Sequence, residues 1–168
     1  MVYLLCSLLS LGFLALDQWV KAYVSANIPL GEARPLIPGF VELRTVHNYG
    51  AAWSSFSGMR WLLVAVTAAI LLVVALCLVK RIVRHPLGLT ACFLILSGGL
   101  GNIIDRVRLG YVVDMFNFQF IRYPVFNVAD IAVVSGATLG VIYYLWFYEK
   151  YDQKKKDGAH GDQDAANQ

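Results

Sequence analysis

Three aspartates within one short stretch are the residues of this sequence best suited to chemistry. Asp105, Asp114 and Asp130 lie between positions 97 and 133, at the edges of segments apolar enough to be in a membrane. Carboxylates are costly near lipid, so three of them in one region indicate a function. We expect two of the three to form an acid–base pair that cuts a peptide bond at the membrane surface.

The expected chemistry follows from the repulsion between two like charges. Two carboxylates that meet in a site of low dielectric cannot both ionise easily, so one keeps its proton and the other does not. Such a pair can activate water with one carboxylate and polarise the scissile carbonyl with the other, as in aspartic proteases. Spacing alone does not choose which two of the three aspartates form the pair.

Other catalytic chemistries have less support in the sequence. The three histidines are scattered, and no serine or cysteine lies in a recognisable nucleophile motif. No CxxC pattern or metal-ligand spacing appears, so we expect neither a metal nor an organic cofactor. The formal net charge of +3 is small, and no basic stripe predicts a nucleic-acid partner. The three cysteines all lie in apolar runs and are typical of small buried or lipid-facing residues: Cys6, Cys77 and Cys92.

Three alternative interpretations stay open at this point. The carboxylates can pair with cations to hold helices together, and Asp105 fits this best because Arg106 and Arg108 are close in sequence. Acids in a membrane also line ion or proton transport paths. Against transport, the acids gather on one side and leave the other half of every predicted span without an ionisable residue. The third alternative is a non-catalytic membrane scaffold.

The elements that must position these residues are membrane helices. Of the 168 residues 58% are hydrophobic and only 15% charged, unlike a soluble globular protein. Long apolar runs predict four transmembrane helices at about 3–24, 61–79, 87–104 and 126–148. We read 27–39 as a loop, 40–46 as a short strand and 111–121 as a strand or an irregular re-entrant piece. The predicted fold is an all-α membrane protein with a small extracytoplasmic β-containing cap.

The chain is expected to form one domain over residues 1–150, followed by a disordered cytoplasmic tail at 151–168. The basic 80–86 loop and the lysines at 154–156 place both termini in the cytoplasm by the positive-inside rule. Asp17, Asn48 and the three aspartates above then gather on the extracytoplasmic side. Asp17 and Lys21 are four residues apart, so they share a helix face and can pair.

Five sequence motifs, in this order along the chain, resemble those of the bacterial lipoprotein signal peptidases (signal peptidase II). The resemblance covers nearly all of the sequence from Leu14 to about Tyr148. The motifs are Leu16-Asp17-Gln18 with Lys21, Asn48-Tyr49-Gly50-Ala51-Ala52-Trp53, the glycine-rich 98–106 segment ending in Asp105-Arg106, Val112-Val113-Asp114-Met115, and Phe126-Asn127-Val128-Ala129-Asp130.

The resemblance implies specific roles. It makes Asp114 and Asp130 the catalytic pair of an aspartic endopeptidase. The residues that it implies for substrate binding or support are Asn48, Gly50, Asn102, Asp105, Arg106, Asn127, Asp17 and Lys21. The implied substrate is a prolipoprotein whose cysteine carries diacylglyceryl, and the cut falls just before that cysteine. The resemblance further implies a monomer in the bacterial cytoplasmic (inner) membrane that contacts membrane lipids and is inhibited by globomycin-type peptides.

Overall fold

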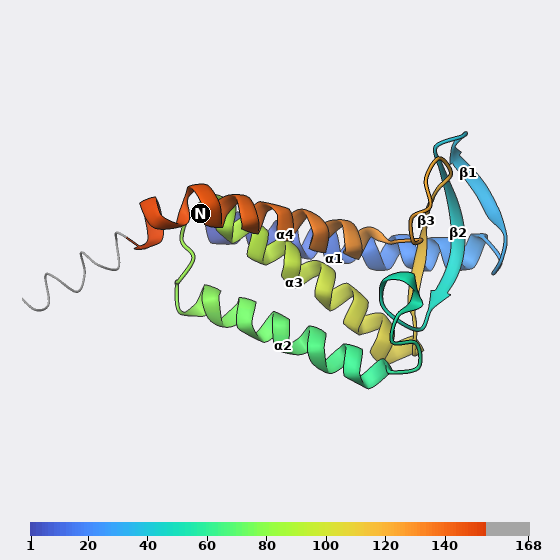
Figure 1. The fold of residues 1–168 in the computed structure, drawn as a ribbon, viewed down its shortest axis with the longest axis horizontal. Coiled ribbons are helices and arrows are strands. Elements are labelled where there is room, and N and C mark those ends of the chain that lie inside the picture. The colour runs from blue at the N-terminus through green and yellow to red at the C-terminus, as the bar shows by residue number, and fades with distance from the viewer. Residues whose placement is uncertain (154–168) are drawn as a thin grey trace, which may run out of the picture.

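Four long helices form the body of the protein (Figure 1). The computed structural model describes residues 1–153. The helices are α1 (Val2–Asn27), α2 (Arg60–Val79), α3 (Pro86–Leu109) and α4 (Val128–Trp146). All four are long and apolar enough to cross a membrane, which confirms the predicted four-span membrane fold.

Helix α3 continues past its predicted end. It reaches Leu109, beyond the predicted end of the span at about 104, and so contains Asn102, Asp105 and Arg106. These polar side chains find partners on neighbouring elements, and the helix can therefore continue through them. It ends at Gly110, whose φ of 92° is the left-handed conformation that glycine adopts most readily after a helix.

Small residues allow α3 to lie close to its neighbours. Helix α3 packs against α1, α2 and α4. A Cβ atom at Gly98 would collide with the carbonyl oxygen of Ala129, and one at Gly136 would lie 2.9 Å from the carbonyl oxygen of Ala91. The glycines therefore allow the α3 and α4 backbones to approach, as expected for membrane helices rich in small residues.

A three-stranded antiparallel sheet caps one end of the helices (Figure 1). Its order is β1 (Ala33–Ile37), β2 (Val41–Asn48) and β3 (Val112–Phe118). The strands predicted near 40–46 and 111–121 are present, whereas the loop prediction for 27–39 was wrong where β1 forms. Pro35 argued against a strand there, but β1 is an edge strand, where proline is tolerated.

The sheet is attached to the bundle through a small apolar core. Val24 of α1 and Ile28, just after the helix, pack with Val113 and Met115 of β3, and Leu43 of β2 joins them. This contact places β3 beside α1 and α3. It therefore brings Asp114, which lies between Val113 and Met115, to the membrane end of the cap.

The opposite end of the bundle carries a short π-helix, Glu149–Gln153. Asp152 in this helix accepts hydrogen bonds from the Tyr143 hydroxyl (2.5 Å) and the backbone N–H of Arg84 (3.3 Å). Helical order thus extends three residues into the tail predicted for 151–168. Residues 154–168 lie outside the described part, and the domain boundary at 150 stays a prediction.

Candidate active site

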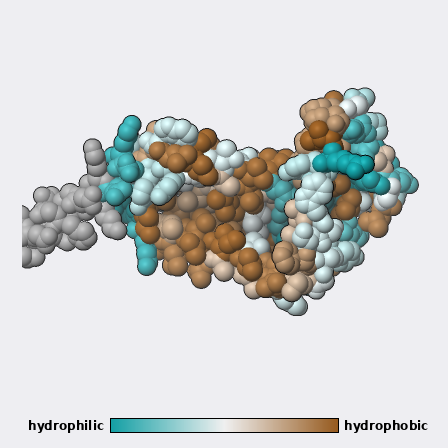
Figure 2. Space-filling model, in the orientation of Figure 1, coloured by the Kyte–Doolittle hydropathy of each residue, from teal (hydrophilic) through white to brown (hydrophobic). Residues whose placement is uncertain are grey.

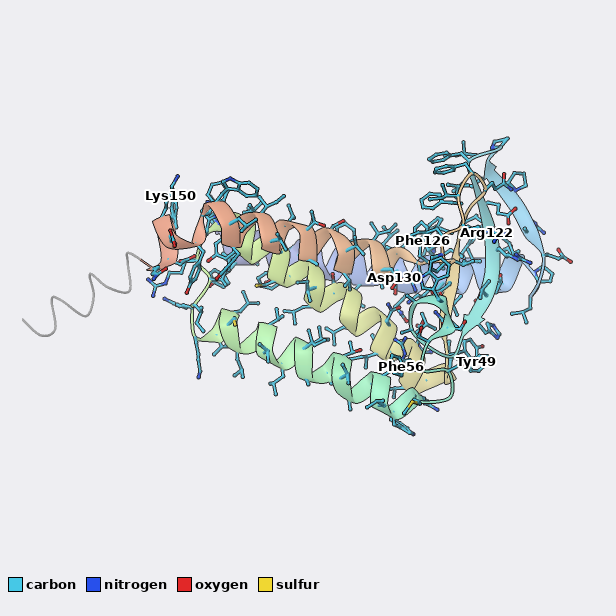
Figure 3. The ribbon with its side chains drawn as sticks, in the orientation of Figure 1. Tyr49, Phe56, Arg122, Phe126, Asp130 and Lys150 are labelled. Atoms are coloured by element: carbon cyan, nitrogen blue, oxygen red, sulfur yellow. The ribbon has the colours of Figure 1, made fainter. Side chains whose placement is uncertain are left out.

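One asparagine holds two aspartates together. The Asn127 side-chain amide donates a 2.6 Å hydrogen bond to Asp114 Oδ1, and its backbone N–H donates to Asp130 Oδ2 at 3.1 Å. Asn127 is completely buried. Figure 3 shows Asp130 where α4 meets the cap. Asp114 comes from β3, so the strand and the helix meet at this asparagine.

The start of α4 explains why Asp130 lies there. Asn127 is the N-cap residue of α4, and its side-chain oxygen accepts a 2.9 Å hydrogen bond from the Asp130 N–H. The Asp130 side chain in turn accepts a hydrogen bond from the Asn127 N–H. The two bonds form a capping box, which requires this spacing of three residues. The positive end of the helix dipole favours a negative charge at Asp130.

Two further amides complete the coordination of the carboxylates. Asn48 Nδ2 donates to Asp114 Oδ2 at 2.9 Å, and Asn102 Nδ2 donates to Asp130 Oδ1 at 2.8 Å. Each of the four carboxylate oxygens therefore accepts one hydrogen bond from a neutral donor. Within residues 1–153 neither carboxylate has a cation within ion-pair distance.

The environment of Asp114 favours its protonated form. The residue is 2% exposed, and burial raises the pKa of its carboxyl to about 7. The neighbouring Asp130 raises this pKa as well, whereas the hydrogen bonds from Asn48 and Asn127 lower it. Asp114 can therefore hold or release a proton near neutral pH.

Both carboxylates face a pocket of about 390 Å³. Its polar end includes Asn48, Asn102 and Arg106 beside the two aspartates. Its remaining wall comes from α2, α3, α4 and the 123–126 segment and is mostly apolar: Ile70, Leu71, Ile95, Val133, Val134, Tyr123, Val125 and Phe126. Such a site suits a largely apolar peptide with one polar bond held at the carboxylates.

A separate ionic cluster lies next to the pair. Lys21 Nζ lies 2.8 Å from Asp17 Oδ2 and 3.0 Å from Asp105 Oδ2, and it donates to Asn102 Oδ1 at 3.0 Å. The predicted pairing of Asp17 with Lys21 is confirmed. Asp105 pairs with a cation, as the structural alternative expected, but that cation is Lys21 of α1 and not an adjacent arginine.

Arg106 turns to the pocket side of α3. Its Nη2 donates to the carbonyl oxygen of Gly50 at 2.8 Å. The Gly50 N–H in turn donates to Asn48 Oδ1 at 2.9 Å. A Cβ at Gly50 would collide with the backbone of Ser55. Arg106 and Gly50 thus hold the loop that places Asn48 against Asp114.

Sequence reasoning assigned no role to Gln18, although it named the motif that contains it. Gln18 Nε2 donates to Asp17 Oδ2 and to Asp105 Oδ1, each at 3.1 Å. Asp17 also accepts from the backbone N–H of Ala129 at 2.8 Å, which ties α1 to the start of α4. The adjacency of Gln18 to Asp17 was the only signal in the sequence, and the contact with Asp105 exists only in the folded chain.

All ten residues that the motifs singled out therefore meet at one end of the bundle, in one connected set of hydrogen bonds and ion pairs. Among residues 1–153, no group of three or more histidine, cysteine, aspartate or glutamate side chains is placed to hold a metal ion.

Comparison with known proteins identifies the family. Residues 9–147 match the protein family described as signal peptidase (SPase) II. The chain belongs to the signal peptidase II family. The match contains the ion-paired cluster, the two aspartates and all three of their side-chain amide donors.

Relatives and solved structures agree with membership of the signal peptidase II family. The chain is 40% identical over 162 residues to the lipoprotein signal peptidase of Enterococcus faecalis, covering 95% of this chain and 96% of that protein. It is 44% identical over 125 residues to the lipoprotein signal peptidase of Lactococcus lactis subsp. lactis, covering 73% and 81%. A solved structure of a bacterial membrane enzyme superposes with a TM-score of 0.80 at 30% identity, covering 83% of this chain and 87% of that one.

Proposed function

We propose that this chain is an aspartic endopeptidase that removes the signal peptide from prolipoproteins, with Asp114 and Asp130 as its catalytic pair. The family and the lipoprotein signal peptidases related to it support the reaction. They give no support to the alternative of ion or proton transport. The assignment of the pair rests on the geometry of the site.

One observation carries the assignment. Asp114 and Asp130 share Asn127 and open onto the same pocket, while the other buried acids of this end are bonded to Lys21. Two neighbouring carboxylates on one pocket, with no ion-paired cation among residues 1–153, are what hydrolysis by an acid–base pair requires.

The surroundings of the two carboxylates assign different roles to them. Asp130 lies in the first turn of α4, where the helix dipole favours the ionised form. Asp114 lies on a strand, without a helix end, and burial raises its pKa to about 7, so a large fraction of it carries a proton near neutral pH. In the proposed mechanism Asp130 is the general base and Asp114 is the general acid.

The reaction then proceeds in two balanced steps. Asp130 takes a proton from a water molecule while the water oxygen attacks the scissile carbonyl carbon, and Asp114 gives its proton to the carbonyl oxygen. In the second step Asp130 passes its proton to the amide nitrogen as the C–N bond breaks. Asp114 recovers a proton from the hydroxyl as the new carboxyl group forms, so both aspartates return to their starting states.

The finer features of the reaction belong to the same proposal. The substrate cysteine carries diacylglyceryl, and the cut falls just before it on the extracytoplasmic side of the bacterial cytoplasmic membrane. Both termini lie in the cytoplasm, the protein acts as a monomer in contact with membrane lipids, and globomycin-type peptides compete for the pocket. The apolar walls of the pocket, at the end of four membrane helices, support a substrate that arrives through the bilayer.

A reconstituted cleavage assay tests the function. The full chain in liposomes is incubated with a diacylglyceryl-modified prolipoprotein, and a gel shift measures release of the signal peptide. We expect cleavage of the modified precursor, and the same precursor without the lipid serves as the matched control. Ion flux through the same liposomes without any cleavage would contradict the proposal and favour transport.

A further inference from the structure

The two faces of the β-sheet differ in polarity toward its far end. Leu43 of β2 packs against the apolar cluster that contains Val24 and Ile28. Val41 lies on the same face by the alternation of a strand, and its cross-strand partner is Phe118. The face that carries Leu43, Val41 and Phe118 is therefore apolar.

The opposite face of the sheet is polar. Glu42 accepts hydrogen bonds from Asn117 Nδ2 at 2.8 Å and from Gln119 Nε2 at 2.7 Å. These bonds and the nearby Arg44 lower the pKa of the Glu42 carboxyl. At its far end, around Glu42 and Asn117, the sheet is thus amphipathic.

The β1–β2 turn and the segment that follows β3 project sideways beyond the helices (Figure 1). We call this part the overhanging tip. Its apolar members are all exposed: Ile37, Phe40, Phe120, Ile121 and Tyr123. Phe40 is 46% exposed and Phe120 is 54% exposed, and their rings stack with centroids 4.7 Å apart. Figure 2 shows hydrophobic residues gathered on this projection.

The chain keeps the overhanging tip close to the membrane. Tyr123 lies five residues before Val128, the first residue of α4. At full extension five residues span at most about 18 Å. The Gln119 N–H also donates to the carbonyl oxygen of Phe40 at 3.0 Å, which joins the β1–β2 turn to the segment that enters α4.

Two arginines accompany the exposed rings. Arg34 of β1 is the cross-strand partner of Leu43, so it lies on the same, apolar face of the sheet. Arg122 lies between Ile121 and Tyr123, and Figure 3 places it on the segment that leads into α4. Both are exposed, and among residues 1–153 neither makes an ion pair.

We infer that the overhanging tip lies in the headgroup layer of the membrane, with its aromatic rings at the interface and Arg34 and Arg122 bound to lipid phosphates. Aromatic rings beside cations, directly before a membrane span, are typical of this layer. Unpaired arginines complement the charge of phosphate, which they bind through two parallel hydrogen bonds. The inference depends on the four membrane helices and not on the catalytic mechanism.

The contact has a consequence for the pocket. The Phe118 and Tyr123 rings lie 5.8 Å apart, and Tyr123 lies 5.7 Å from Phe126. Tyr123 and Phe126 both line the pocket that holds the two aspartates. A row of aromatic rings therefore joins the lipid-bound tip to the pocket wall.

The depth of two adjacent residues tests the inference. Cys6, Cys77 and Cys92 are replaced by alanine, and Phe120→Cys and Gln119→Cys are labelled separately with a fluorophore in vesicles of phosphatidylcholine and phosphatidylglycerol. Lipids that carry a nitroxide near the headgroup should quench most of the fluorescence of the label at position 120. They should quench little of the fluorescence at position 119, whose side chain lies on the polar face. Equal quenching at the two positions would overturn the inference. Quenching at position 120 that disappears when the protein-to-lipid ratio is raised would also overturn the inference, because a second copy of the chain would then cover the tip.

A second measurement uses the chain with its native cysteines. Native mass spectrometry counts the phosphatidylglycerol that stays bound to the wild type, to Arg34→Gln with Arg122→Gln, and to the control Arg44→Gln on the polar face. We expect the double variant to lose affinity by roughly fivefold per arginine, and the control to match the wild type. Equal lipid retention by all three proteins would overturn the inference even if the cysteine-free chain failed to fold.

Discussion

Two groups of buried carboxylates lie next to each other in this protein, and they differ in what holds them. Asp17 and Asp105 are both ion-paired with Lys21. Within residues 1–153, Asp114 and Asp130 accept hydrogen bonds only from amides, and Asn127 donates to both. The groups are connected, because Asn102 accepts a hydrogen bond from Lys21 and donates one to Asp130.

This difference in partners assigns a structural role to the ion-paired acids and a chemical role to the amide-held acids. A carboxylate next to a cation is stabilised in its ionised form and exchanges its proton with difficulty. A carboxylate held by neutral amides keeps its position and can still gain or lose a proton. The ion-paired group can therefore position the helices while the amide-held group performs proton transfer.

The largest effect should come from removing either amide-held acid. Asp114→Asn or Asp130→Asn should lower cleavage of the lipid-modified precursor by at least about 10³-fold, because general acid–base catalysis contributes up to about 10⁴-fold. Circular dichroism and thermal unfolding in detergent should stay close to the wild type. Asp105→Asn is the matched control, and we expect it to lower stability more than turnover. A folded Asp105→Asn protein that binds the substrate without cutting it would break the comparison.

The ion-paired group should respond in the opposite way. Lys21→Met leaves Asp17 and Asp105 without their cation, and breaking a buried pair on one side costs about 3–5 kcal/mol. We expect the loss in the free energy of unfolding, measured in detergent. Adding Asp17→Asn and Asp105→Asn to Lys21→Met should recover part of that loss, because fewer buried charges are unpaired. A Lys21→Met protein of unchanged stability would show that the cluster does not hold the helices.

A smaller and graded effect is expected from pH. If Asp114 acts as the acid, kcat/KM should fall by about tenfold per pH unit above its pKa of about 7. The raised pKa also means that the folded state binds this proton more tightly than the unfolded state, so stability falls as the pH rises toward 7. Rates should therefore be compared well below the unfolding temperature at each pH. A rate that rises through pH 7 would assign the ionised form of Asp114 to the reaction.

The sequence was most informative where a short-range pattern determines position. Apolar length predicted the four spans, and the spacing of four residues predicted the contact between Asp17 and Lys21. Charge distribution placed the acids at one end of the spans. The resemblance to a family, and not the spacing, selected Asp114 and Asp130.

The predictions failed where rotation about a helix or a tertiary partner decides the outcome. Asp105 and Arg106 are adjacent in sequence but point to different sides of α3, one to Lys21 and one to Gly50. The same polar residues resemble a helix end until α1 supplies their partners. The edge strand β1 was missed because its proline and its exposure are also typical of a loop.

The contact between Lys21 and Asp17 also bears on how the protein is made. A lone lysine or aspartate at the centre of a helix costs about 2.5–3.5 kcal/mol on insertion by the translocon. Helix α1 carries both, one turn apart, so it can enter the bilayer as a nearly neutral segment before the later spans are synthesised. Asp105 can reach Lys21 only after α3 has been inserted. The first span therefore already holds, in the bilayer, the lysine that Asp105 of the third span binds.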